Sequence, residues 1–280
     1  MRIGIIGDGF VGSAIRLSLE SKKFIYKESL FIYDKYKICD YTSTNLEELL
    51  ITDIIFLCLP TQYNSIKESY DLTSLEETLE YLNNNNYDGI CLIKSTILPN
   101  TTKTFSEKYI NLKLIHNPEF LSASTAFEDF QNQNHIVLGI TNANMEKEIN
   151  IIKEFYTKNY LKANISIMTS TESELMKLSA NCFYSVKIQY FTEIYLLCQK
   201  LNCSYDTIRE SILKNGWINP MHTLVPGTDG NISYGGFCFP KDTMALDKYM
   251  EKNISPHSVL NSTIKERNIM REDKKNITFI

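Results

Sequence analysis

A glycine-rich turn near the start of the chain has the spacing of a dinucleotide site. Residues 7–12 read G-D-G-F-V-G, directly after the apolar run Ile3–Ile6 and directly before the helical run Ala14–Leu19. In this setting the first glycine permits a tight turn, the second lets the backbone approach a pyrophosphate, and the third allows close packing of helix on strand. The N-terminus of the helix would face the anion. The residues expected to contact the cofactor here are Gly7, Gly9, Phe10, Val11 and Gly12.

Asp34 ends the next predicted strand and indicates which dinucleotide is bound. A carboxylate at this place accepts hydrogen bonds from a ribose 2′-hydroxyl and repels a 2′-phosphate, so the sequence favours NAD over NADP. Two alternatives stay open. The glycines could form an ordinary turn, and Asp34 could be a turn-forming residue whose neighbour Lys35 weakens the discrimination against NADP.

Three later segments have a composition that is unusual for core or loop sequence. They cover residues 94–99, 117–121 and 235–242, and each follows a predicted strand or a glycine turn. Ligands bind beyond the carboxyl ends of the strands in open α/β sheets, and loops carry much of a protein's chemistry. The third segment contains Cys238. The alternative for any cysteine is a small buried apolar residue, which is our interpretation of the other six.

Two sequence patterns describe the elements that must position these residues. The first 170 or so residues alternate short apolar runs with polar helical stretches, which predicts βαβ units and a parallel sheet. A long helical pattern then covers residues 172–199 and opens on Thr171 to Glu174, with the spacing of a capping box. This helix is apolar almost all round, so it must be buried on several sides, by a second domain or in a dimer. The predicted strands are Ile3–Ile6, Leu30–Tyr33, Ile54–Leu59, Gly89–Ile93, Lys113–Ile115, Ile136–Ile140 and Asn164–Met168.

We therefore expect an α/β protein with a Rossmann-like, doubly wound parallel sheet, followed by an all-helical central domain with one long helix. The expected domains are residues 1–169 for NAD binding, 170–261 for dimerisation and catalysis, and 262–280 as a charged C-terminal segment. A second helix is expected from Tyr205, then a loop over Asn215–Gly236, and a last helix over Ser262–Asn276.

Composition argues for a small-molecule substrate. The 280 residues carry a net charge of −4, which gives no basic field for nucleic acid or for an anionic membrane. The seven cysteines are an odd number, contain no C-x-x-C pair and lie mostly in apolar runs, so we expect free thiols in the cytoplasm. No apolar run approaches the roughly 20 residues of a membrane span, and we expect neither a targeting segment nor a metal site.

Together with residues 58–61 and 174–181, the three segments closely resemble the ordered motif set of the UDP-glucose/GDP-mannose dehydrogenase family. The resemblance runs from residue 1 to about residue 270. It implies an enzyme of nucleotide-sugar metabolism and polysaccharide biosynthesis. The homodimer is expected separately, because the long helix is apolar on several faces around residues 182–197. The implied reaction is an NAD-dependent, four-electron oxidation of a nucleotide-sugar C6 alcohol to the carboxylate, with UDP-glucose to UDP-glucuronate as the first expectation.

The resemblance also assigns roles to individual residues. Cys238 matches the nucleophile that forms a thiohemiacetal and then a thioester. Lys177 and Asn181 match the pair that contacts the reacting oxygen, and Asp242 matches the aspartate that holds the lysine or a water. The Thr and Glu that position the hydrolytic water match Thr96 and Glu119. Further implied cofactor contacts are Pro60, Thr61, Ser95, Thr96 and Lys241, and the implied substrate contacts are Glu119, Phe120, Leu121, Lys177, Asn181, His222, Tyr234 and Gly235.

Several features depart from the family pattern. Ser122-Ala123 stands where a second glutamate usually follows, and the stretch between Asp34 and Cys58 is shorter than usual. Family members normally continue with a second Rossmann-like domain that binds the nucleotide of the sugar donor, and we expect this chain to lack it. Two rival functions stay open: a two-electron dehydrogenase of the β-hydroxyacid or 6-phosphogluconate type, and a truncated homologue that binds NAD without turnover.

Overall fold

The computed structural model describes residues 1–43 and 45–271, and the chain divides into two compact units. The first unit contains Met1–Thr61 and Asp71–Lys177. The second contains the short segment Gln62–Tyr70 and the chain from Leu178 onward. The division falls inside the long helix, whereas the domain limits expected from the sequence lie at 169/170 and 261/262, and those limits stay a prediction.

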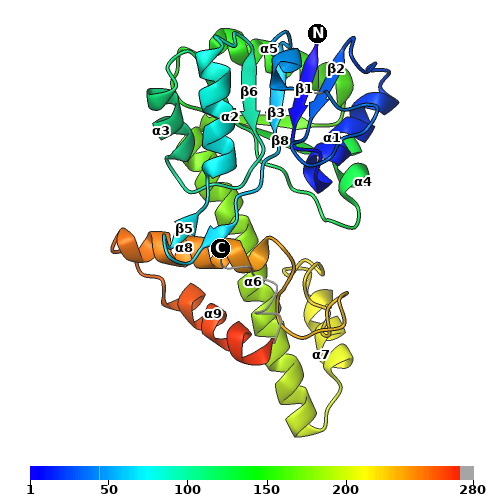
Figure 1. Ribbon diagram of the computed structural model, residues 1–280. Coiled ribbons are helices and arrows are strands. Elements are labelled where there is room, and N and C mark those ends of the chain that lie inside the picture. Colours follow the sequence, from blue (N-terminus) through cyan, green and yellow to red (C-terminus); the bar gives the residue numbers. More distant parts are fainter. Residues whose placement is uncertain (44, 272–280) are drawn as a thin grey trace. The chain divides into compact units, whose positions relative to one another are not determined.

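The first unit is built on a seven-stranded sheet with the order β2-β1-β3-β6-β7-β8-β9 (Figure 1). All neighbouring strands are parallel except β7 and β8, which run antiparallel. The mostly parallel, Rossmann-like sheet predicted from the sequence is thus confirmed. The strands are β1 (Ile3–Ile6), β2 (Leu30–Tyr33), β3 (Ile54–Leu57), β6 (Ile90–Ile93), β7 (Lys113–His116), β8 (His135–Ile140) and β9 (Asn164–Thr169).

Helices and a 3-10 turn cover both faces of this sheet, and two separate apolar cores result. Alternate strand residues point to opposite faces, so Ile3 and Ile5 join one core while Ile6 joins the other. The first core packs α1, α4 and α5 on the sheet, and the second packs η1, α2 and α3. These elements are α1 (Phe10–Ser21), η1 (Leu46–Leu49), α2 (Thr73–Asn84), α3 (Thr101–Lys108), α4 (Ala126–Gln131) and α5 (Glu146–Asn159).

The strand order places a switch point beside β1. Strand β1 pairs with β2 on one edge and with β3 on the other, so the chain leaves β1 and β3 toward opposite halves of the sheet. Ligands of open α/β sheets bind outside the carboxyl ends of the strands at such a point. The glycine turn after β1 and the loop after β3 both lie there.

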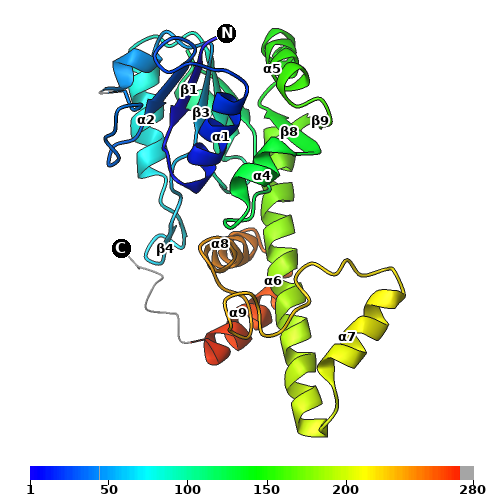
Figure 2. The ribbon, with the colours of Figure 1, turned by 90° about the vertical axis from the view of Figure 1, so that its right-hand side faces the viewer.

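The second unit is helical, with one short hairpin (Figures 1 and 2). The hairpin strands β4 and β5 pair with each other and come from the first third of the sequence. Glu68 in the hairpin forms an ion pair with Lys248 of α8, with Oε1 and Nζ 3.2 Å apart. The elements are β4 (Tyr63–Asn64), β5 (Ser69–Tyr70), α7 (Tyr205–Lys214), α8 (Phe239–Lys252) and α9 (Ser258–Met270), while α6 (Ser170–Leu201) runs from the first unit into the second.

The start of the long helix corrects one sequence-based interpretation. Its capping box uses Thr169 and Glu172, not Thr171 and Glu174: the Glu172 carboxylate accepts from the Thr169 amide at 2.8 Å, and the Glu172 amide donates to the Thr169 hydroxyl at 3.3 Å. Glu174 instead turns inward and accepts a hydrogen bond from the Thr102 amide at 2.7 Å. Two overlapping Thr-x-x-Glu patterns occur here, and burial of Glu174 decides between them.

Near the C-terminus the helices also differ from expectation. The helix predicted over Ser262–Asn276 begins earlier, at Ser258, and ends at Met270, while residues 272–276 lie outside the described residues. Helix α8 was not predicted: no element was assigned between the expected loop, which ends at Gly236, and the expected last helix. Pro240 stands in the first turn of α8, where a missing amide hydrogen costs no hydrogen bond.

Candidate active site

The glycine turn after β1 has the geometry of a phosphate cradle. Gly7 has φ +90°, and a Cβ there would lie 2.4 Å from the carbonyl oxygen of Cys58 at the end of β3. A Cβ on Gly12 would lie 1.8 Å from the carbonyl oxygen of Gly7. Both glycines are therefore required by contacts within the protein. A Cβ on Gly9, in contrast, would meet nothing within 4 Å, so the space beside this backbone is open to a ligand.

The first turn of α1 supplies donors for that ligand. Gly9 is the N-cap, and its carbonyl accepts the first intrahelical bond from the Ser13 amide at 2.8 Å. The amides at the start of a helix lack intrahelical partners and give this end a partial positive charge. No acidic residue occupies the first turn of α1 in the described chain. The open space and the helix end together fit a dinucleotide pyrophosphate.

Asp34 has a structural role in the same region that leaves room for the predicted one. Its Oδ2 accepts from the Asp8 amide at 2.8 Å, and its Oδ1 accepts from the amides of Tyr36 and Lys37 at 2.9 Å each. A carboxylate offers about four acceptor positions, so Oδ2 retains one for a ribose hydroxyl. The turn-forming and the ribose-binding interpretations of Asp34 are therefore compatible.

Two hydroxyl groups join the loops that follow β3 and β6. The Thr61 hydroxyl donates to the Thr96 carbonyl at 2.7 Å, and the Ser95 hydroxyl donates to the Leu59 carbonyl at 2.6 Å. The structure thus brings three of the predicted cofactor residues together at the carboxyl end of the sheet. Pro60 lies exposed between them. The hydroxyl groups of Thr61 and Ser95 fix the loops, so their own contacts with a cofactor stay a prediction.

A buried ion pair connects the loop after β7 with the start of the long helix. Lys177 Nζ lies 3.2 Å from Glu119 Oε1, and the two side chains are 5% and 7% exposed. The second oxygen of Glu119 accepts from the Leu121 amide at 2.6 Å, and Lys177 Nζ lies 5.2 Å from the centre of the Phe120 ring. Each of the two buried charges has a partner, and a buried charge without one would be strongly destabilising. An ammonium and a carboxylate so placed can stabilise an oxyanion and accept a proton.

Lys94, for which the sequence suggested no role, holds the start of this loop through two hydrogen bonds. Its Nζ donates to Asn117 Oδ1 and to the Pro118 carbonyl, each at 3.2 Å, while the Asn117 amide donates to the Val137 carbonyl at 2.8 Å. Burial lowers the pKa of Lys94 to about 8. Lys94 therefore orders the backbone immediately before Glu119. The signal was available, because a lysine within a strand-end motif is unusual, but its partners could not be read from the sequence.

In the second unit, three side chains converge on Asp242. The carboxylate is fully buried, and its Oδ2 accepts from the Asn181 amide at 2.7 Å. Its Oδ1 accepts from the Tyr70 hydroxyl at 2.5 Å and from Lys241 Nζ at 2.6 Å. Burial, followed by the nearby Asp242 charge, raises the pKa of Tyr70 well above 10. We call Asp242, Asn181, Tyr70 and Lys241 the aspartate cluster.

The aspartate cluster adds one residue to the predicted site and gives Lys241 a partner within its own unit, while the contact of Lys241 with the cofactor stays a prediction. Tyr70 was missed, because it lies on the hairpin far from the motifs and no local pattern marks it. Lys241, predicted to contact the cofactor, forms its ion pair with Asp242 and lies 4.6 Å from the Tyr70 ring centre. The expected contact between Asp242 and Lys177 joins residues of different units and stays a prediction.

Cys238 differs from the other cysteines in its surroundings. It is partly exposed, occupies the N-cap position of α8 and follows Gly236, whose φ is +78°. The positive end of a helix favours a thiolate. Burial instead raises the pKa of Cys58 to about 12 and raises the pKa of Cys91 and Cys182 further. Cys91, Cys182 and Cys198 are buried, as expected, and the half-buried Cys58 packs against the core. The expectation is wrong for Cys203, which is exposed, and Cys39 is only half-buried. The N-cap place of Cys238 on α8 is the better position for a nucleophile.

The predicted substrate residues before Cys238 have unequal access. His222 has φ +64°, and its ring lies 4.8 Å from that of Tyr184 and 5.5 Å from that of Phe239. Tyr234 is 1% exposed, with its hydroxyl 3.4 Å from that of Thr243. A Cβ on Gly235 would lie 2.5 Å from the Arg271 guanidinium. The Tyr234 side chain therefore serves the core of the unit.

Within residues 1–43 and 45–271, no group of three or more His, Cys, Asp or Glu side chains is arranged to hold a metal ion. In the same part of the chain, no helix has the length and apolar character needed to cross a membrane.

Comparisons with known proteins match this architecture. Residues 34–160 match the model of the "UDP-glucose/GDP-mannose dehydrogenase family, NAD binding domain", and residues 171–268 match the model of the same family's central domain. A UDP-glucose 6-dehydrogenase of Rickettsia bellii is 30% identical, over 98% of this chain and 69% of that relative. The chain belongs to the UDP-glucose/GDP-mannose dehydrogenase family. Its first unit is accordingly the NAD-binding part, and its cofactor is NAD.

Solved structures agree on the fold. A UDP-glucose dehydrogenase from Pyrobaculum islandicum superposes with a TM-score of 0.82 at 20% identity, covering 96% of this chain and 68% of that one. A UDP-D-ManNAc dehydrogenase from Pyrococcus horikoshii gives 0.78 at 20% identity, with 96% and 69% covered. At this identity the likeness concerns the fold, and the two enzymes are named for different sugars.

Proposed function

We propose that this chain is a cytoplasmic dehydrogenase that oxidises the C6 alcohol of a nucleotide sugar to a carboxylate, with UDP-glucose as the first candidate substrate. The observation that carries the proposal is Cys238, a partly exposed thiol at the N-terminus of α8, in a chain whose family is that of nucleotide-sugar dehydrogenases. A two-electron dehydrogenase has no use for such a thiol.

The chemistry explains why a thiol is needed. The first oxidation removes a hydride and a proton from the alcohol and leaves an aldehyde, which must not escape. The Cys238 thiolate adds to the aldehyde carbon, forming a C–S bond, and the oxygen takes up a proton. A second oxidation removes that proton and a hydride and leaves a thioester; water then breaks the C–S bond and releases the acid and the thiol. NAD, when bound, supplies the hydride acceptor for each oxidation.

Charged and polar residues would support both oxidations. The Lys177 ammonium would stabilise negative charge on the reacting oxygen, and Asn181 would donate a hydrogen bond beside it. Asp242 would fix Asn181, to which it is already hydrogen-bonded at 2.7 Å. Asn181 follows Lys177 by one turn on the continuous helix α6, so both side chains project from the same face.

Hydrolysis of the thioester needs a base and an oriented water. Glu119 is held by Lys177 and by the Leu121 amide, which fixes both of its oxygens. We assign to Glu119 the activation of the water, and to Thr96 its positioning, because the Thr96 backbone is tied to Thr61. The place of the second glutamate of the family is taken by Ala123, which supplies no acid or base.

The test is the stoichiometry of cofactor reduction. The chain should be incubated with NAD and a panel of UDP- and GDP-sugars, and NADH should be counted by absorbance against sugar consumed. The proposal predicts two NADH per sugar for at least one nucleotide sugar, with UDP-glucose tried first. One NADH per substrate, with a β-hydroxyacid as the only substrate, would establish the two-electron rival; NAD binding without turnover would establish the non-catalytic homologue.

We also propose a homodimer formed through α6. Phe183, Tyr190, Leu197 and Leu201 are each 47–66% exposed, and the first three follow a seven-residue spacing on one helix face. Large apolar side chains in such a row mark a helix-pairing surface. Light scattering at low micromolar protein should give twice the chain mass of 32.3 kDa. A mass of 32.3 kDa would contradict the dimer.

A further inference from the structure

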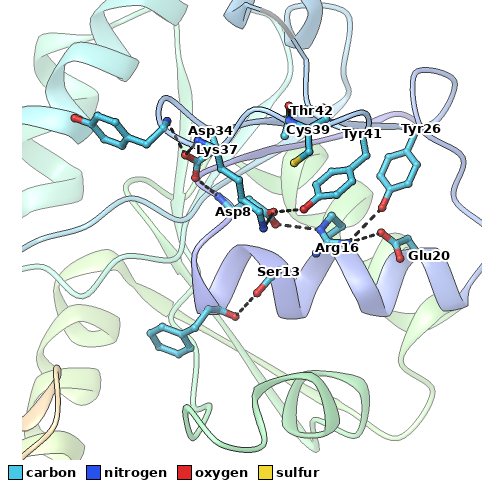
Figure 3. Close-up of polar contacts among 12 residues, drawn as sticks. Asp8, Ser13, Arg16, Glu20, Tyr26, Asp34, Lys37, Cys39, Tyr41 and Thr42 are labelled. Atoms are coloured by element: carbon cyan, nitrogen blue, oxygen red, sulfur yellow. Dashed lines mark hydrogen bonds and ion pairs between the residues drawn. The ribbon is translucent and has the colours of Figure 1, made fainter.

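Asp8, the second residue of the glycine turn, is the centre of a charged cluster in the first unit (Figure 3). Its Oδ2 accepts from Lys37 Nζ at 2.5 Å and from the Tyr41 hydroxyl at 3.2 Å. Its Oδ1 accepts from Arg16 Nε at 3.1 Å. The Asp8 side chain is fully buried, although a carboxylate between two glycines would be expected to face solvent. Burial of a carboxylate is tolerated here because two cations and a hydroxyl satisfy it.

The charges of this cluster cancel. Arg16 also pairs with Glu20, with Nη1 and Oε1 2.8 Å apart, and its guanidinium carbon lies 4.4 Å from the centre of the Tyr41 ring. The hydrogen bond that Lys37 donates to Asp8 is the main cause that raises the pKa of Lys37 to about 12. Arg16, Lys37, Asp8 and Glu20 thus sum to zero. Both cations are engaged by carboxylates of the protein itself.

The cluster lies beside the carboxylate that distinguishes the two dinucleotides. Asp34 receives the amide of Asp8 on one oxygen and the amide of Lys37 on the other. In this fold the ribose 2′-hydroxyl is recognised at the end of the second strand, and NADP proteins place a cation there to hold the 2′-phosphate. Lys37 is 43% exposed and belongs to the turn that Asp34 organises, so it is in the right place to serve as such a cation.

We propose that Asp8 is a specificity-determining residue, which excludes NADP by occupying Lys37 and Arg16. A 2′-phosphate would need an uncommitted cation to offset the repulsion from Asp34, and Asp8 withholds both that the cluster contains. The negative charge of Asp34 then acts unopposed on the phosphate. Discrimination here rests on an internal competitor for the cations as well as on a repulsive carboxylate. The proposal rests on NAD binding and is independent of the thioester chemistry.

A simpler account of the cluster is that it only braces the turn over residues 34–43 against α1. The Tyr41 ring stacks on Tyr26 with centroids 5.5 Å apart, which supports such a brace. The two accounts differ in one observable. A brace affects NADH and NADPH equally, because both share the turn, whereas a competitor for cations affects the phosphorylated dinucleotide alone.

The experiment compares the affinities of NADH and NADPH by calorimetry for four forms of the full chain: wild type, Asp8→Asn, Asp8→Glu and the double variant Asp8→Asn with Lys37→Gln. Asparagine keeps the size and an acceptor oxygen but removes the charge. We expect Asp8→Asn to bind NADPH at least tenfold more tightly than wild type, with NADH affinity within about threefold. Asp8→Glu should keep the preference of the wild type, and the double variant should lose the gain.

Lys37→Gln alone keeps the proposal testable if the Asp8 variants do not fold. Lys37 is partly exposed, so this change should leave the fold intact. Without Lys37 the Asp8 charge is less neutralised, so NADPH affinity should fall at least threefold further while NADH affinity holds. Unchanged NADPH affinity in either Asp8→Asn or Lys37→Gln, or equal changes for both dinucleotides, would overturn the proposal.

Discussion

The glycine turn and the aspartate cluster both place polar groups in defined positions, but one uses the backbone and the other uses side chains. The turn uses backbone: glycines at 7 and 12 that tolerate no side chain, and the amides of a helix end. The aspartate cluster uses side chains from the hairpin, α6 and α8, which meet on one buried carboxylate. The cradle therefore requires that a few neighbouring residues have no side chain. The cluster requires particular side chains from residues that are far apart in sequence.

This difference predicts different responses to substitution. Adding one methyl group to the cradle should change folding or cofactor binding, because atoms collide there. Changing one side chain among the proposed catalytic residues, such as Lys177 or a member of the aspartate cluster, should leave cofactor binding intact. It should reduce turnover, because only a charge or a hydrogen bond is removed.

Apart from substitution of Cys238, Lys177→Ala should give the largest loss. Removal of the ammonium takes away the charge that stabilises the reacting oxygen, so we expect kcat to fall by ~10² to 10³. NAD affinity, measured by calorimetry, should be unchanged within about threefold. Lys200→Ala is the matched control, since this lysine lies in the last turn of the same helix and is exposed. Loss of NAD binding in Lys177→Ala would show that the residue serves the cradle instead.

Substitutions in the aspartate cluster should rank by the number of contacts removed. Asp242→Asn removes the charge that receives three donors, and we expect kcat to fall by about 10²; Tyr70→Phe removes one hydrogen bond to a charged group and should cost roughly tenfold. Tyr63→Phe, on the paired strand of the hairpin, controls for the loss of a tyrosine hydroxyl. A Tyr70→Phe enzyme with normal kcat at every pH would show that Tyr70 does not position Asp242 for the reaction.

The two glycine substitutions should separate folding from binding in the cradle. Gly12→Ala places a Cβ on the Gly7 carbonyl, so the turn must move, and we expect a loss of about 1–3 kcal/mol in unfolding free energy. Gly9→Ala meets no protein atom and should leave stability within about 0.5 kcal/mol of wild type. It should nevertheless weaken NAD binding about tenfold, because the methyl group occupies the open space. Normal NAD affinity in Gly9→Ala would contradict the assigned position of the pyrophosphate.

A buried carboxylate that belongs to neither region makes the stability of the chain depend on pH. Burial raises the pKa of Glu174 from 4.5 to about 7 in the folded chain. Folding then favours the protonated form, so its contribution to stability is full below pH 4.5 and is lost as pH rises toward 7. The loss is on the order of 2–3 kcal/mol. Denaturant melts at pH 5 and pH 8 should show a smaller decline for Glu174→Gln than for wild type; equal declines would contradict the shift.

The glycine turn could be predicted from the residues themselves, whereas residues of the aspartate cluster were found only through family resemblance. The reason is that the turn is a local pattern and the cluster depends on long-range contacts. Strands β1 and β2 and the glycine turn are local patterns, in which apolar alternation and glycine spacing determine the backbone. Tyr70 and Lys94 act through contacts with residues far along the chain, and no spacing encodes such contacts. The cap of α6 shows an intermediate case: two Thr-x-x-Glu patterns overlap, and tertiary burial of Glu174 selects the earlier one. Asp8 stands inside a predicted motif, yet two of its partners, Lys37 and Tyr41, lie on a turn whose path the sequence does not specify.

The central claim, that the cradle binds while Cys238 carries the chemistry, is tested most directly with Cys238→Ser. Purified variant and wild type should be compared for NAD affinity by calorimetry and for sugar acid formed from UDP-glucose by mass spectrometry. Serine is close in size but a poorer nucleophile at neutral pH, and its ester is less reactive than a thioester. The account predicts unchanged NAD affinity and a loss of acid formation of about 10³-fold or more. Near wild-type acid formation by Cys238→Ser would contradict it.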